Sequence, residues 1–99
     1  MKINIQYVHM TTSEAMNAYV TEKLENLYRK FDWIIKAEVH FEIENNEKTK
    51  GKICKIELSA PGPRLFAASN EENYENAVKQ TIKDLEIQLK KRKNVFQNH

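Results

Sequence analysis

The chain has 99 residues, 40% of them hydrophobic, which predicts one small domain with a single core. Two glycines, two prolines and a formal net charge of +2 exclude collagen-like, low-complexity and strongly acidic or basic classes. The longest apolar run, residues 65–68, is far too short to span a membrane, and the first residues do not resemble a leader peptide. We therefore expect a cytoplasmic protein without membrane contact.

The chain opens with a predicted strand and a predicted helix. Residues 2–8 alternate between apolar and polar side chains, which is the period of a half-buried strand. Apolar residues spaced by three and four then predict a helix over residues 12–30. Thr11, Thr12 and Ser13 are alternative N-caps for this helix, and the sequence leaves the choice among them open.

Three further strands are predicted in the middle of the chain. Residues 37–44 alternate in the same way, and the polar segment 45–50 predicts a hairpin connection that ends at a glycine. A third strand covers residues 54–60. The Pro-Gly-Pro turn at 61–63 then leads into a short fourth strand over 64–69, because proline fixes φ and glycine permits unusual backbone angles.

The last predicted element is a helix over residues 71–93. Glu71, Glu72 and Glu75 fall in its opening turns, where the positive helix pole favours carboxylates. The order of elements predicts an α+β fold, a βαβββα two-layer sandwich whose four-stranded sheet carries both helices on one face. We expect this sheet to be mostly antiparallel, although periodicity alone gives neither the order nor the polarity of its strands.

Positive charge is concentrated in the last predicted helix. Between positions 79 and 93 two acidic residues accompany six cationic ones, a local net charge of +4: Lys79, Lys83, Lys90, Lys91, Arg92 and Lys93. At 100° per residue, the first three of these and the last lie within about 80° of arc. Glu86 interrupts that stripe. A positive surface on a nearly neutral protein is typical of polyanion binding.

The first predicted helix carries a second basic stripe. Lys23 and Lys30 are seven residues apart and nearly eclipsed, and Arg29 flanks them. If both helices lie on one side of the sheet, the two stripes face outward together, an arrangement suited to a phosphate backbone rather than to reading bases. The alternative is a solvated helix end that keeps cations near its own negative pole.

Most aromatic residues are expected in the core, because they fall at helical or strand spacing. This set comprises Tyr19, Tyr28, Phe31, Phe41, Phe66 and Tyr74. Aromatic side chains at such spacing are far more often buried than exposed for base stacking. We therefore expect binding through charge and shape.

No catalytic constellation is present in the sequence. His9, His40 and His99 lack metal-ligand spacing, and two glycines cannot build a phosphate-binding loop. Cys54 lies in an apolar strand, where a small buried side chain is expected rather than a nucleophile or a disulfide. The sequence thus predicts no enzyme activity, no cofactor and no bound metal.

The whole chain resembles the short ribosome hibernation promoting factors, also called ribosome-associated inhibitors or sigma-54 modulation proteins. The resemblance is carried by the order and spacing of several segments: INIQYVHM, TSEAMNAYV, EKLENLYRKFD, LFAASNEENYENAV and KDLEIQLKKRK. It implies a fold similar to that of double-stranded-RNA-binding domains. It also implies binding to the small ribosomal subunit and its rRNA at the decoding region, in competition with mRNA and with tRNA in the A and P sites.

The resemblance further implies that binding inhibits translation and preserves idle ribosomes in stationary phase or stress. The family's basic positions match Lys23 here, with Arg29 and Lys30 nearby, and its closing basic pair matches Lys91 and Lys93. Lys90 and Arg92 are additional charges. Two departures, Lys79 where many relatives are acidic and Asp84-Leu85 where many have Lys-Leu, leave the individual phosphate partners open.

The sequence therefore predicts a single ribosome-binding domain over residues 1–99 that is monomeric when free. Long relatives add a second domain for ribosome dimerisation, and the chain is closer to the short type. Two alternatives stay open: a general double-stranded-RNA-binding module, and a protein-interaction domain that docks its basic end on an acidic partner.

Overall fold

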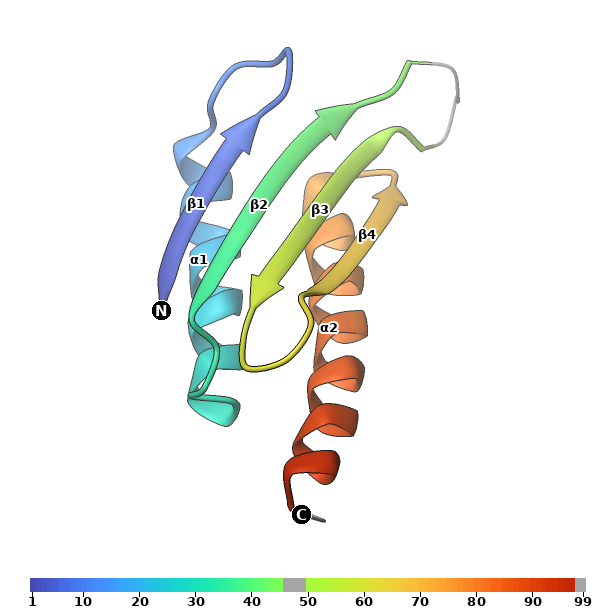
Figure 1. The fold of residues 1–99 in the computed structure, drawn as a ribbon. Helices are drawn as coiled ribbons and strands as arrows, with labels where there is room; N and C mark the ends of the chain where they lie inside the picture. Colours follow the sequence, from blue (N-terminus) through green and yellow to red (C-terminus); the bar gives the residue numbers. More distant parts are fainter. Residues whose placement is uncertain (46–49, 98–99) are drawn as a thin grey trace.

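The computed structural model describes residues 1–45 and 50–97 (Figure 1). Six elements follow one another along the chain: β1 (Lys2–Tyr7), α1 (Glu14–Lys30), β2 (Lys36–Ile43), β3 (Lys52–Ser59), β4 (Leu65–Glu71) and α2 (Tyr74–Gln97). The strands form one sheet, and both helices lie on the same face of it (Figure 1). The predicted α+β sandwich of βαβββα order is confirmed.

The sheet has the order β1-β2-β3-β4 and mixes parallel and antiparallel pairs. β1 runs parallel to β2, whereas β2–β3 and β3–β4 are antiparallel. A parallel pair needs a crossover connection, which α1 supplies between β1 and β2. Both helices return from the same end of the sheet, so their N-termini lie together at one end of the molecule and their C-terminal ends at the other (Figure 1).

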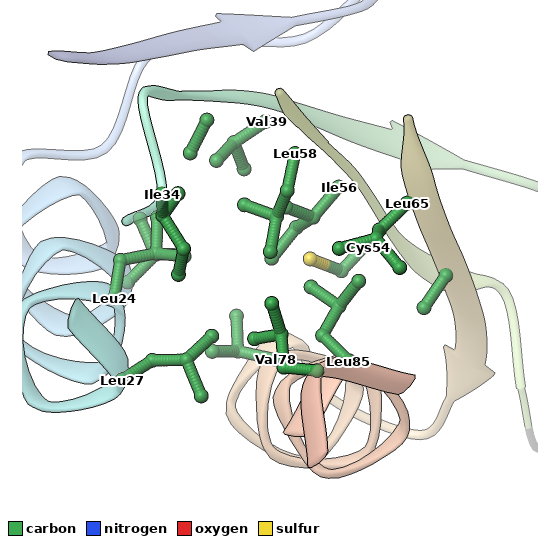
Figure 2. Packing of buried hydrophobic residues seen from close by; sticks show 14 of the residues in the cluster. Leu24, Leu27, Ile34, Val39, Cys54, Ile56, Leu58, Leu65, Val78 and Leu85 are labelled. Atoms are coloured by element: carbon green, nitrogen blue, oxygen red, sulfur yellow. The ribbon is translucent and has the colours of Figure 1, made fainter. Parts of the chain in front are cut away.

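The core fills the space between the sheet and the two helices (Figure 2). The alternation of the strands turns residues such as Val39 and Ile56 inward, where they meet Leu24 of α1 and Leu85 of α2, all four without exposed surface. Cys54 is likewise fully buried, as expected, and burial raises the pKa of its thiol to about 12. At neutral pH the thiol is therefore protonated and inert as a nucleophile.

β4 and the start of α2 differ from the sequence prediction. Phe66, expected in the core, is 53% exposed, because its inward neighbours Leu65 and Ala67 fix the alternation of β4 and turn the ring to the outer face. Glu71 belongs to β4, where it pairs with Lys52, and not to the helix. The helix begins later because the side chain of Asn73 accepts a hydrogen bond from the amide of Asn76 at 2.8 Å.

α2 also continues past its predicted end at Lys93. Nothing in the segment 94–97 breaks a helix, since it holds neither proline nor glycine. Phe96 packs edge-to-face on Trp33, which follows α1, with the ring centroids 5.2 Å apart. This contact ties the last turns of α2 to the segment that follows α1, while α2 projects past the ends of the strands (Figure 1).

The β2–β3 connection depends on a glycine. Gly51 has φ of +124°, and a Cβ there would clash with the carbonyl oxygen of Glu44. Its amide donates to the side chain of Asn70 at 2.6 Å, and the amide of Glu44 donates to its carbonyl at 2.8 Å. Residues 46–49 of the predicted connection, and His99, lie outside the described residues.

Ser13 is the N-cap of α1, which resolves the choice among three residues. Its hydroxyl accepts a hydrogen bond from the amide of Met16 at 3.2 Å. We expect Ser13→Ala to lower the free energy of unfolding by about 1 kcal/mol, because an amide of the first turn loses its partner. Urea denaturation followed by circular dichroism measures this change. Thr12→Ala is the matched control, with an expected change below about 0.5 kcal/mol, and an equal loss in both variants would contradict the assignment.

Candidate nucleic-acid interface

A groove of about 380 Å³ lies between α1 and α2, and all the residues that line it belong to these two helices. Four of the residues that line it are lysines: Lys23, Lys79, Lys83 and Lys90, together with Ile82, Glu86 and Ile87. Three of these lysines come from α2 and one from α1. The groove therefore combines cations from two helices with two apolar side chains. Its charge also depends on Glu86, which lines the groove, and on Lys30, which forms an ion pair with Glu86.

Lys23, Lys79 and Lys83 line the groove and differ in the contacts that their side chains make within the protein. The ammonium of Lys23 lies 5.3 Å from the centre of the Tyr19 ring, one helical turn earlier, a cation–π contact that favours one position of this half-buried side chain. Lys79 and Lys83 are exposed. Neither takes part in an ion pair within residues 1–45 and 50–97. Their ammonium groups are thus available to an anionic partner.

Glu86 lies between a lysine of α1 and a lysine of α2 at the other end of the groove. Its carboxylate lies 3.4 Å from the ammonium of Lys30 on α1 and 3.3 Å from that of Lys90 on α2. Partial burial acts to raise the pKa of Glu86, but hydrogen bonds and charge from Lys90 and Lys30 prevail and hold this pKa below its usual range. The carboxylate is therefore ionised at neutral pH.

The remaining predicted cations do not share this groove. Arg29 lies on the β1 side of α1, beside Met1 and Ile3, and its guanidinium donates to Asn26. Lys93 is exposed on α2 outside the lining of the groove.

Lys91 and Arg92 line a second groove on the other flank of α2, where the turn 61–63 faces the helix. Arg92 donates to the carbonyl of Pro61 at 3.2 Å and lies over Gly62, so part of the hydrogen-bonding capacity of its guanidinium is used within the protein.

The structure thus brings five of the nine predicted cations together at the groove between α1 and α2: Lys23, Lys30, Lys79, Lys83 and Lys90.

The apolar floor of the groove was absent from the sequence prediction. Ile87 lies off the buried seam of α2 and is 48% exposed, and Ile82, expected in that seam, is half-buried at the groove. Tyr19 was expected only as a core residue. Its spacing of four from Lys23 on one helix face is a signal that predicts their contact.

Between 1–45 and 50–97, no three histidine, cysteine, aspartate or glutamate side chains are grouped so as to hold a metal ion. In the same part of the chain, neither helix has an apolar stretch of the length that crosses a bilayer. What the arrangement can do is hold phosphates through lysine ammonium groups.

Comparisons with known proteins agree on one family. The family described as "Sigma 54 modulation protein / S30EA ribosomal protein" matches residues 3–96. A ribosome hibernation promoting factor from Pseudomonas putida is 30% identical over 98 residues, which cover 99% of this chain and 92% of the relative. The resemblance stated from the sequence is confirmed.

Solved structures show the same fold. A ribosomal subunit interface protein from Coxiella burnetii superposes with a TM-score of 0.84 at 26% identity, over 95% of this chain and 99% of that one. The N-terminal domain of Protein Y from Thermus thermophilus gives a TM-score of 0.78 at 22% identity, over 92% and 98% of the two chains, and shows the fold alone. The chain belongs to the sigma 54 modulation protein / S30EA ribosomal protein family, a family of ribosome-associated binding proteins that are not enzymes.

Proposed function

We propose that this protein binds the small ribosomal subunit in the cytoplasm and holds idle ribosomes inactive. The groove between α1 and α2 contacts rRNA phosphates at the decoding region, so that the bound protein occupies the space of mRNA and of tRNA in the A and P sites. Translation stops while the complex lasts, and the ribosomes are preserved through stationary phase or stress. The family and the name of the Pseudomonas putida relative support a role in ribosome hibernation.

The observation that carries the proposal is the groove lined by lysines from two helices that are far apart in the sequence. A phosphate backbone presents regularly spaced anionic oxygens, which lysine ammonium groups bind without reading sequence. Lys79 and Lys83 on α2 face Lys23 on α1 across this groove. A single flexible cationic tail gives no such fixed spacing, whereas two packed helices do. The apolar floor adds contact area for sugar edges or bases.

Co-sedimentation with purified small ribosomal subunits tests the proposal. We expect the protein to pellet with the subunits at low salt and to be released as salt rises, because phosphate binding releases condensed counterions. Excess mRNA together with tRNA should also displace it, since they occupy the same region. Binding that is insensitive to both competitors would contradict the decoding-region placement, even if the protein pellets.

The same assay separates the two alternatives. A general double-stranded-RNA-binding module would bind free RNA duplexes about as well as subunits. A protein-interaction domain would keep its partner after RNase treatment. We expect neither result: subunits should compete effectively against a large excess of duplex, and RNase should abolish the association.

A further inference from the structure

Glu86 is an anionic side chain in a groove whose other lining residues are four lysines and two isoleucines. Its carboxylate oxygens lie 3.4 Å and 3.3 Å from the ammonium groups of Lys30 and Lys90, and its side chain is 26% exposed. The two lysines are 60% and 65% exposed. A carboxylate between two ammonium groups has the charge and the oxygen acceptors that a phosphate would offer at the same point.

These ion pairs do little to hold the fold together. Both distances are longer than the usual 2.7–2.9 Å of a charge-assisted N–H···O bond, taken as an approximate range. The two lysine side chains are exposed, and ion pairs of this kind contribute little to stability. The helices are instead joined by packing and by the contact between Trp33 and Phe96. A stronger anionic ligand can therefore replace Glu86 at small structural cost.

We propose that Glu86 is an internal competitor for phosphate: its carboxylate occupies the position between Lys30 and Lys90 that an RNA phosphate takes in the complex. The proposal rests on the proposed function, because it uses the same groove. A single phosphate gains little by displacing Glu86. An RNA surface that also reaches Lys79 and Lys83 gains several contacts at once. Glu86 thus lowers affinity for isolated anions and favours partners that present several phosphates in a fixed array.

Removal of the competing charge should strengthen binding. We expect Glu86→Gln to bind small subunits about three- to tenfold more tightly near 0.1 M salt, because two further lysines face the RNA without a paired carboxylate. The slope of log affinity against log salt should steepen by up to about 2, one for each released lysine. Sedimentation or fluorescence anisotropy across a salt series measures both quantities.

A double-mutant cycle tests whether the effect acts through the paired lysines. In the parent protein, Lys30→Gln should change affinity by less than about twofold, because Glu86 already occupies that ammonium group. In the Glu86→Gln background, the same change should cost about three- to fivefold. Equal effects in the two backgrounds would overturn the inference, because Lys30 and Glu86 would then act independently of one another.

Asp84→Asn is the matched control, since it removes one negative charge from an exposed position of the same helix outside the groove. It should raise affinity less than twofold. Glu86→Gln binding that is no tighter than the parent overturns the inference, and weaker binding would show instead that the ion pairs position the lysines. Failure of the parent to bind subunits overturns the proposed function alone, and the same comparison on a short RNA duplex then decides the role of Glu86.

Discussion

Reversal of charge at Lys79 and Lys83 together should weaken binding to small ribosomal subunits by at least about tenfold near 0.1 M salt. Both side chains are exposed at the groove, and neither forms an ion pair among the described residues. The charge reversal therefore breaks no ion pair of that part of the chain, and its effect should be on binding affinity. The salt slope should fall by about 2, because two phosphate contacts are lost. Equilibrium co-sedimentation of the Lys79→Glu/Lys83→Glu variant over a salt series measures both changes.

The matched control reverses two lysines away from the helices. Lys2 and Lys50 are exposed on β1 and just before β3. Each Lys→Glu change subtracts two charges, so both double variants fall from +2 to −2 in formal net charge. If binding followed net charge alone, the two variants would lose affinity equally. We expect the Lys2→Glu/Lys50→Glu variant to lose less than about threefold, because long-range repulsion is screened at this salt concentration.

Phe41→Ala should produce the largest loss of stability among single changes in the core. Phe41 has no exposed surface, and its ring stacks on Tyr7 at 5.2 Å and meets Tyr74 edge-on at 5.6 Å. Truncation leaves a cavity between the sheet and α2, which costs about 3–5 kcal/mol. For a domain of this size, each kcal/mol lowers Tm by about 4–8 °C, so Tm should fall by at least about 12 °C.

Phe66→Ala serves as the comparison. The same chemical change on the outer face of β4, where the ring is 53% exposed, should cost less than about 1 kcal/mol. Urea denaturation of the two variants, with thermal unfolding as a second measure, gives both values. Similar losses for Phe41 and Phe66 would show that the sheet buries both faces, contrary to the structure.

The order and type of all six elements could be predicted from the sequence, because each has a clear apolar period. The predictions that were wrong concern residues whose position depends on their neighbours along the strand or on the adjacent strand. Phe66 is as apolar as Phe41, and only the inward placement of Leu65 and Ala67 turns it outward. Glu71 suits the first turn of a helix, yet pairing with Lys52 extends β4 through it. Strand pairing therefore overrode a local helix-start signal.

The candidate site could be predicted only in part, for a related reason. Helical arithmetic groups Lys79, Lys83 and Lys90 on one side of α2, and the structure places these three at the groove. The same arithmetic cannot say which side of α1 meets α2, so Arg29 was included although it lies beside β1. Glu86 was recognised as an interruption of the stripe. Its second partner, Lys30, is 56 residues away in the sequence, and no local pattern connects them.

The common direction of α1 and α2 has a consequence for how the protein meets its target. Glu14 and Glu75 lie in the first turns of the two helices, whereas Lys30 and the run ending at Lys93 lie toward the opposite end. Along the two helices, the first turns therefore carry acidic side chains and the far ends carry basic ones, although the formal net charge of the chain is only +2. An approaching polyanion exerts a torque on such a particle and turns it before contact. A rise in ionic strength should accordingly lower the association rate constant by a larger factor than it raises the dissociation rate constant.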